Sequence, residues 1–150
     1  MKLISVLVVI SLSLVPGYTQ DGSDLESEKI AIEKTVRNYV DGWYEGSRER
    51  MDKALHPALI KRGVRRSKTG KLFLQPLGKS AMLEYTAMGA GKRKDGSMPQ
   101  NQVMVMDVTG DIAMAKSISP DFIDLLHLVK LEGEWKIIHV IWQPHSVKKK

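Results

Sequence analysis

The first third of the chain shows a helical pattern of apolar positions. The apolar side chains recur at steps of four, three and four residues, at Ile32, Val36, Tyr39 and Trp43. Most charged residues of this segment lie at other positions of the helical turn. The sequence S-x-x-E at 23–26 has the form of a capping box, and Gly46 is a typical helix stop. We therefore expect one helix over about 23–45. A second, shorter helix is predicted from a Ser47 cap through Leu55.

The middle of the chain predicts short extended segments and a third helix. His56-Pro57 closes the second helix, because the residue before a proline resists helical geometry. Residues 59–64 and 72–77 are predicted as strands around a polar turn at 67–70, and residues 79–88 as a helix. Residues 89–100 are predicted as a flexible connection. The Gly-Ala-Gly-Lys sequence within them lacks the spacing of a phosphate-binding loop.

The last third of the chain predicts two β-hairpins. Residues 103–108 and 112–118 flank Gly110-Asp111, and this register gives one face Met104, Met106, Val108, Ala113, Ala115 and Ser117. Residues 122–131 and 134–143 are joined through Glu132-Gly133, and a two-residue loop there sets Leu126 opposite His139.

That register divides the second hairpin into two faces, both of them largely apolar. One face carries Phe122, Asp124, Leu126, Leu128, Ile137, His139 and Ile141, and the other carries Leu125, His127, Val129, Ile138, Val140 and Trp142. Strands of this kind are usually covered on both sides. We expect helices of the same chain on one side and a partner subunit, in a homodimer, on the other.

The N-terminus has the pattern of a signal peptide. Lys2 precedes an apolar run from Leu3 to Val15, which is shorter than the roughly 20 residues that a membrane-spanning helix needs. Cleavage is expected after Gly17, or as late as Gln20, which predicts a secreted or periplasmic protein without an integral membrane segment. The alternative is a buried N-terminal helix. The remaining chain is predicted as a single domain over 24–145, followed by a basic tail at 146–150.

Composition removes several functional classes. The chain has 150 residues, enough for one domain, and 43% of them are hydrophobic. The net charge of +6 is scattered in short groups without interleaved aromatics, so we expect no nucleic-acid partner. The absence of cysteine excludes disulfides, thiolate zinc sites and cysteine nucleophiles. The four histidines lack the spacing of metal ligands, so we expect no metal, and no Gly-x-Ser-x-Gly elbow supports a Ser–His–Asp hydrolase. We expect no cofactor.

The order of these elements resembles the nuclear transport factor 2-like (SnoaL-like) superfamily. The segments that carry a closer likeness to its putative lumazine-binding family are 39–46 (YVDGWYEG), 55–57 (LHP), 107–111 (DVTGD) with Ala113 and Ala115, and 133–137 (GEWKI). The likeness extends over about residues 27–145. It implies an α+β fold in which a cone-shaped, curved, mostly antiparallel sheet wraps around the N-terminal helices. Members of the superfamily include isomerases, cyclases, dehydratases and proteins that only bind.

Asp124 and His139 are the candidate catalytic residues. The predicted register puts them diagonally across one face of the last hairpin, where a carboxylate and an imidazole could act as a proton-transfer pair. The resemblance supports this choice, because superfamily enzymes often use an aspartate or histidine that projects into the cone. The alternative is a structural hydrogen bond between the two side chains. His127 falls on the opposite face, but a one-residue bulge would exchange it with His139.

Further residues are candidates for the lining of a pocket. His56 could lie at the mouth of the cone or bond a free carbonyl at a helix end, and Arg62, Arg65 or Arg66 could contact an anionic substrate or only solvate an edge strand. The apolar lining is expected from Tyr39, Trp43, Met82, Tyr85, Met104 and Met106, all of which could instead be ordinary core residues.

Three functions are compatible with these features. The first is an exported protein that binds a small, mainly apolar molecule. The second is a cofactor-free isomerase, cyclase or dehydratase that uses the Asp124–His139 pair. The third is a dimeric interaction module without a pocket, which would act through the face of His127 and Trp142.

Overall fold

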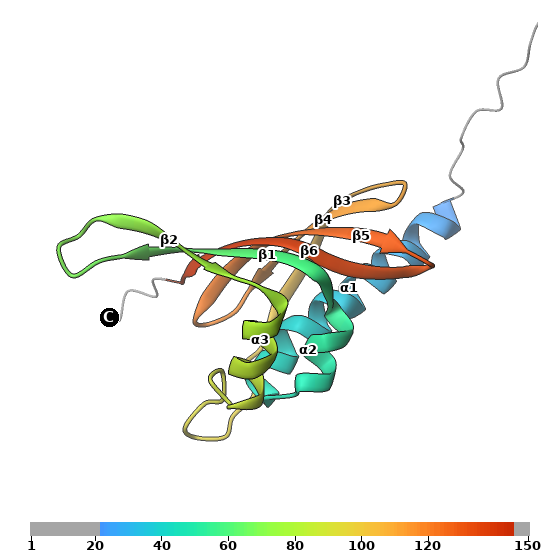
Figure 1. Ribbon diagram of the computed structural model, residues 1–150. Helices are drawn as coiled ribbons and strands as arrows, with labels where there is room; N and C mark the ends of the chain where they lie inside the picture. The colour runs from blue at the N-terminus through green and yellow to red at the C-terminus, as the bar shows by residue number, and fades with distance from the viewer. Residues whose placement is uncertain (1–21, 146–150) are drawn as a thin grey trace, which may run out of the picture.

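The computed structural model describes residues 22–145 and shows an α+β fold built on one sheet (Figure 1). Its elements are α1 (Gly22–Glu45), α2 (Arg48–Ala54), β1 (Leu55–Arg66), β2 (Leu72–Leu77), α3 (Lys79–Ala87), β3 (Gln102–Thr109), β4 (Ile112–Ile118), β5 (Phe122–Leu131) and β6 (Glu134–Pro144). The six strands follow the order β2-β1-β6-β5-β4-β3. Only the β1–β6 pair is parallel, so the sheet is mostly antiparallel, as predicted.

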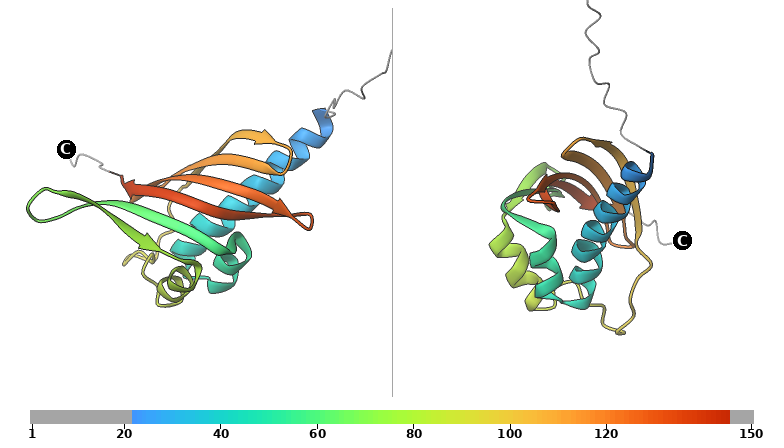
Figure 2. Two further views of the ribbon diagram at one scale, coloured as in Figure 1. Left: turned by 45° about the horizontal axis from the view of Figure 1, so that its top comes forward. Right: turned by 90° about the vertical axis from the view of Figure 1, so that its right-hand side faces the viewer.

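The three helices lie on one side of the sheet, and the sheet curves around them without closing (Figure 2). The apolar face of α1 meets the inner face of the sheet, and this contact forms the core. Its most deeply buried side chains are Ile32, Val36, Met51, Leu55, Leu126, Leu128, Ile137 and Val140. The apolar side chains whose spacing predicted α1 therefore face the core, as expected. Val40 and Tyr44 are buried on the same side of the helix.

The predicted first strand is longer in the structure. Extended backbone begins at Leu55, directly after α2, and the strand runs through Pro57 to Arg66 instead of covering only 59–64. Pro57 has no N–H to give to a sheet, and the paired residues of β1 and β6 skip from Leu55 to Ile60. The proline thus occupies an irregular stretch where no ladder bond is required.

A bulge in β6 makes the predicted register of the second hairpin wrong after Ile137. Lys130 lies opposite Trp135 and Leu128 opposite Ile137, as predicted, but the next pair is His127 with His139. Ile138 is the extra residue, and it reverses the facing of everything after it. Val140 and Trp142 therefore face the helices, whereas His139 and Ile141 face outward.

A second bulge, at Met106 in β3, makes the predicted register of the first hairpin wrong before residue 107. Val108 pairs with Ala113 as predicted, but Val105 pairs with Ala115 and Val103 with Ser117. The inner face of β3 is consequently formed by valines. Met104 and Met106 are 41% and 56% exposed, so neither contributes to an inner pocket.

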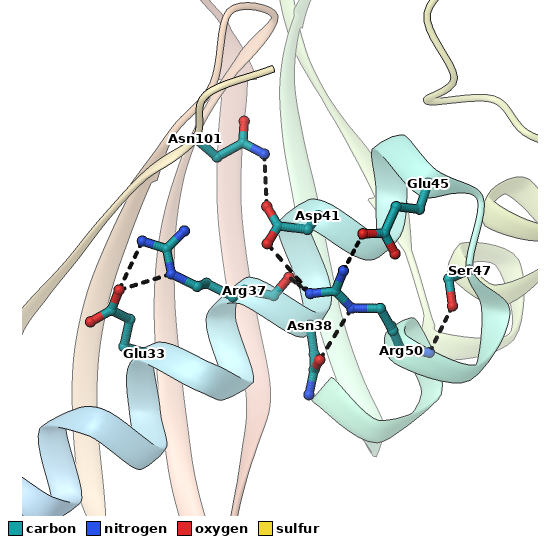
Figure 3. A network of polar contacts seen from close by, with 8 residues as sticks. All are labelled: Glu33, Arg37, Asn38, Asp41, Glu45, Ser47, Arg50 and Asn101. Atoms are coloured by element: carbon teal, nitrogen blue, oxygen red, sulfur yellow. Dashed lines mark hydrogen bonds and ion pairs between the residues drawn. The ribbon is translucent and has the colours of Figure 1, made fainter. Parts of the chain in front are cut away.

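A polar network holds α2 against α1 (Figure 3). The Arg50 guanidinium on α2 donates to Asn38 Oδ1 at 3.3 Å and to the Arg37 carbonyl at 3.2 Å, and it pairs with the carboxylates of Asp41 and Glu45. Asp41 also accepts a bond of 3.0 Å from Asn101 Nδ2, just before β3. The network fixes the end of α1 that carries the aromatic residues of the site described below.

Two expectations concern segments outside the described residues, the signal peptide at 1–17 and the basic tail at 146–150. The helix α1 already includes Gly22, just before the start predicted at residue 23. Within residues 22–145, no helix combines the length and the apolar character that crossing a bilayer requires.

Candidate functional site

A cavity of about 300 Å³ lies between α1, α3 and the inner face of the sheet. Its wall is mainly aromatic and aliphatic, and it contains one acid and two bases. The lining residues are Tyr39, Val40, Trp43, Tyr44, Lys61, Arg65, Gln75, Leu77, Met82, Tyr85, Ala90, Ser119, Phe122, Asp124 and Trp142. A hollow of about 510 Å³ adjoins it under residues 90–95 and shares Trp43, Ala90 and Phe122 with it. Apolar walls around a few convergent polar groups are typical of small-molecule sites.

A buried cluster of three ionisable side chains forms part of this wall. Lys61 Nζ donates to Tyr39 Oη and, at 3.3 Å, to Asp124 Oδ1. Tyr39 Oη donates to the same carboxylate oxygen at 2.9 Å, and Ser117 Oγ donates to Asp124 Oδ2 at 3.2 Å. Asp124 is 4% exposed and Lys61 is 7% exposed. A buried ion pair of this kind is tolerated when further hydrogen bonds satisfy it, as they do here.

Burial changes the acidity of two members of the cluster. It raises the pKa of Tyr39 well above the ordinary value, and the neighbouring Asp124 carboxylate raises it further. Burial also lowers the pKa of Lys61, while Asp124 acts in the opposite direction. Tyr39 therefore stays a neutral phenol that passes a hydrogen bond from the lysine to the carboxylate.

The inner face of β1 brings two cations against one indole. Lys61, Gly63 and Arg65 alternate along the strand and share its inner side. Gly63 pairs with Trp142 of β6, and a Cβ at residue 63 would stand 2.6 Å from the indole. The missing side chain lets the ring lie across the strand, with Lys61 Nζ 5.2 Å and Arg65 Cζ 5.5 Å from the ring centre.

The opposite side of the cavity is formed by an aromatic corner. Phe122 makes an edge contact with Trp142 at 5.2 Å and with Trp43 at 6.5 Å between ring centroids. Its position depends on Tyr44, whose Oη donates to Asp121 Oδ2 at 2.9 Å in the turn before β5. Burial and the Asp121 carboxylate raise the pKa of Tyr44 to about 12, so this bond persists at neutral pH.

The cavity contains five of the predicted site residues, namely Tyr39, Trp43, Met82, Tyr85 and Asp124, and also Arg65 of the three alternative arginines. His139 is not among them, because the bulge at Ile138 turns it to the outer face. The predicted Asp124–His139 pair is therefore wrong, and Lys61, Tyr39 and Ser117 take the place of the imidazole around the carboxylate.

The remaining predicted residues also lie elsewhere. Met104 and Met106 are on the outer face for the reason given above. Arg62 is on that face too, where its Nη1 lies 3.5 Å from His139 Nε2. His56 borders a separate hollow near the β5–β6 turn, and its Nδ1 accepts the N–H of Ala58 at 3.1 Å. It neither lines the mouth of the cone nor bonds a carbonyl at the end of a helix.

A histidine pair marks the outer face. His127 and His139 lie opposite each other on β5 and β6, with their Nδ1 atoms 3.4 Å apart and Arg62 next to them on β1. Burial, His127 and Arg62 together lower the pKa of His139. The residues around the pair on this face are exposed and apolar, among them Ile60, Met114, Leu125 and Ile141.

Several cavity residues were not predicted for the site, among them Lys61 and Trp142. Arg65 was named only as one of three arginines that could contact a substrate. A lysine in a short strand usually marks a solvated position, and Trp142 was assigned to the outer face by the unbulged register. The available signal was the alternation Lys-x-Gly-x-Arg at 61–65. Glycine inside a strand often marks the close approach of another group, which here is an indole.

Among residues 22–145, no group of three or more His, Asp or Glu side chains could hold a metal ion. The polar groups of the cavity are suited to hydrogen bonding and charge pairing with an organic molecule.

The curved, unclosed, mostly antiparallel sheet packed against three helices is a nuclear transport factor 2-like fold. The chain belongs to the family described as "putative lumazine-binding", whose sequence profile matches residues 27–143. The predicted resemblance is thus confirmed. No curated protein matches the chain.

Solved structures share this fold at low sequence identity. A nuclear transport factor 2-like protein of unknown function from Silicibacter pomeroyi is 20% identical, with a TM-score of 0.65 over 81% of this chain and 98% of the other. A putative scytalone dehydratase from Novosphingobium aromaticivorans is 16% identical, with a TM-score of 0.59 over 81% and 86%. A ketosteroid isomerase-like protein from Erwinia carotovora is 14% identical, with a TM-score of 0.57 over 79% and 97%. At these identities the likeness concerns the fold alone.

Proposed function

We propose that the protein binds a small, mainly apolar molecule in the cavity between α1, α3 and the sheet. The observation that carries the proposal is an aromatic cavity of about 300 Å³ whose wall includes a buried ionisable cluster. Lys61 has three N–H donors and uses two of them within the cluster, so one remains for a ligand. The family membership supports small-molecule binding in general terms.

Binding of a neutral aromatic probe tests this proposal. N-phenyl-1-naphthylamine should bind with a stoichiometry of one per chain and gain fluorescence. Ala90→Trp, which fills the cavity from its wall, should abolish the gain. Ala87→Trp is the matched control, because this exposed residue of α3 does not line the cavity. Absence of binding to the wild-type protein, or equal binding by both variants, would contradict the proposal. If the probe binds as expected, native mass spectrometry of protein purified from its own host would identify a ligand that co-purifies with it.

A second candidate function is cofactor-free proton transfer. The buried Lys61, with its lowered pKa, and the Asp124 carboxylate favour it, because either group could accept a proton from a substrate in the cavity. The test is ring opening of 5-nitrobenzisoxazole, which proceeds when a base removes the C3 proton. The wild-type rate should exceed that of Asp124→Asn and of Lys61→Met. Equal rates in all three proteins would eliminate this function and leave binding.

We further propose that the protein acts after export. The apolar run at residues 3–15 supports this, because its length and flanks are those of a signal peptide. Mass spectrometry of the protein from fractionated cells should find a chain that starts between Tyr18 and Asp21 outside the cytoplasm. A chain that keeps Met1 and stays in the cytoplasm would refute export.

We also propose that two copies of the chain associate through the outer face of the sheet. The exposed apolar side chains of that face support this, since such patches commonly mark an interface. Light scattering after size exclusion should give twice the chain mass. Ile141→Glu on the outer face should give the single mass, whereas Ile30→Glu, an exposed position on α1, should leave the dimer intact. A monomeric wild-type protein would overturn the proposal.

A further inference from the structure

The charges along the inner face of β1 do not cancel. Lys61 and Asp124 form a pair whose net charge is zero whether the shared proton sits on the amine or on the carboxylate. Arg65 lies two positions beyond Gly63 on the same face and lines the same cavity. Within residues 22–145, no carboxylate lies at ion-pair distance from its guanidinium. The cavity wall therefore retains one positive charge, and Arg65 carries it.

The guanidinium of Arg65 lies over the indole of Trp142. Its Cζ lies 5.5 Å from the centre of the indole, and the indole is itself confined by Gly63 beneath it and Phe122 at its edge. A contact with the face of an aromatic ring leaves the N–H groups of a guanidinium free to donate to another partner. The planar fork of these donors matches the two oxygens of a carboxylate or a similar oxyanion.

We propose that the ligand is a flat aromatic anion, with its ring against the aromatic wall and its anionic group on Arg65. The inference rests on the proposed function and specifies the substrate class of the same cavity. The volume of about 300 Å³ suits a molecule of two or three rings. Asp124 adds no net repulsion of the anion, because Lys61 balances its charge and Tyr39 and Ser117 donate hydrogen bonds to it.

Two matched probes separate this inference from the proposed function. 8-Anilinonaphthalene-1-sulfonate is N-phenyl-1-naphthylamine with one added sulfonate, so the pair differs chiefly in the negative charge. The wild-type protein should bind the anionic probe about tenfold more tightly than the neutral one, the difference that one charge-assisted contact supplies. Neutral-probe binding without that preference would overturn the inference and leave the proposed function standing. Binding of neither probe would overturn both.

Substitutions on the two sides of β1 localise the effect. Arg65→Gln should remove the preference, so that the anionic and the neutral probe bind this variant with similar affinity. Arg62→Gln is the matched control: it removes the same charge from the same strand but on the outer face, so the preference should persist. Arg65→Lys keeps the positive charge but lacks the paired N–H donors of a guanidinium, so it should retain part of the preference. This variant provides a readout if Arg65→Gln is poorly folded. A preference that survives Arg65→Gln, or that Arg62→Gln removes equally, would refute the assignment of Arg65.

Discussion

Leu125 and Leu126 are neighbours in β5, yet they belong to two different surfaces. Leu126 is 1% exposed and packs beneath α1, whereas Leu125 is 45% exposed on the outer face. Both faces of the sheet are rich in apolar residues, but only the inner one is covered by the helices of the described chain (Figure 2). The cavity that contains the Lys61 cluster lies on this inner side. Each face also holds a polar cluster. The members of the inner Lys61–Tyr39–Asp124 cluster are buried and hydrogen-bonded to one another, and the outer His127–His139 pair lies close to solvent.

This contrast shows that composition does not distinguish a core face from an interface in this sheet. What distinguishes them is where the helices lie and how the polar groups are satisfied. An inner polar group depends on its partners, because water cannot replace them, whereas an outer one can exchange a lost partner for water. The following substitutions compare the two faces on that basis.

The largest effect is expected at the inner cluster. Asp124→Ala leaves the Lys61 ammonium buried without its counter-ion and should lower the free energy of unfolding by about 3–5 kcal/mol. The double variant Lys61→Met with Asp124→Leu should recover most of that loss, since apolar residues can replace a buried pair. Urea denaturation measures both. His139→Ala on the outer face should cost less than about 1 kcal/mol, and an equal cost at both sites would contradict the distinction.

The adjacent leucines give the next largest difference. Leu126→Ala should cost about 2–5 kcal/mol, because it opens a cavity in the packed core. Leu125→Ala should cost less than about 1 kcal/mol in dilute protein. If the outer face joins two copies, the cost of Leu125→Ala should rise with protein concentration, because association stabilises the folded chain. Unfolding curves over a hundredfold range of concentration test this dependence.

A smaller effect is expected where the indole meets the backbone. Gly63→Ala places a Cβ 2.6 Å from the Trp142 ring, so the ring must move toward the cavity. We expect a loss of about 1–3 kcal/mol and at least tenfold weaker binding of the neutral probe. Gly22→Ala is the control, because a Cβ there meets nothing within 4 Å and alanine favours the helix. Normal probe binding by Gly63→Ala would show that Trp142 does not shape the cavity.

Much of the fold could be predicted from local patterns. The bounds of β2, β4 and β5 are those predicted, and α3 ends one residue earlier than predicted. Turn residues such as Gly110 and Gly133, both with positive φ, mark hairpins whatever the strands pack against. The α+β class follows from these elements and their order.

The candidate site was harder to predict, because it depends on contacts between distant segments. Both faces of β6 are apolar, so no alternation revealed the extra residue at Ile138, and that residue decides which histidine and which tryptophan face inward. Lys61 meets Asp124 only because β1 pairs in parallel with β6, a crossover that local pattern does not encode. The sequence predicted that Asp124 and Tyr39 face inward, and both line the cavity. Asp124 precedes the bulge in the chain, and Tyr39 lies on a regular helix.

The smallest effect is expected from pH at the outer face. His139 lies between His127 on β5 and Arg62 on β1, and burial together with these neighbours lowers its pKa in the folded protein. The unfolded chain, with the ordinary histidine value of about 6.5, then binds more protons than the folded chain below that pH. Stability should therefore be complete above about pH 6.5 and decline as the pH falls toward the lowered value, by less than about 1 kcal/mol.

The variant His139→Gln isolates this contribution. The difference in unfolding free energy between wild type and variant should change between pH 7.5 and pH 5.5, with the wild type losing more. Arg62→Gln removes one of the neighbouring positive charges, so it should reduce the wild-type decline without abolishing it. Identical pH profiles for wild type and His139→Gln would mean that folding does not lower the pKa of His139. The outer face would then be fully solvated at this position, and its polar cluster would differ from the inner one even more than the structure indicates.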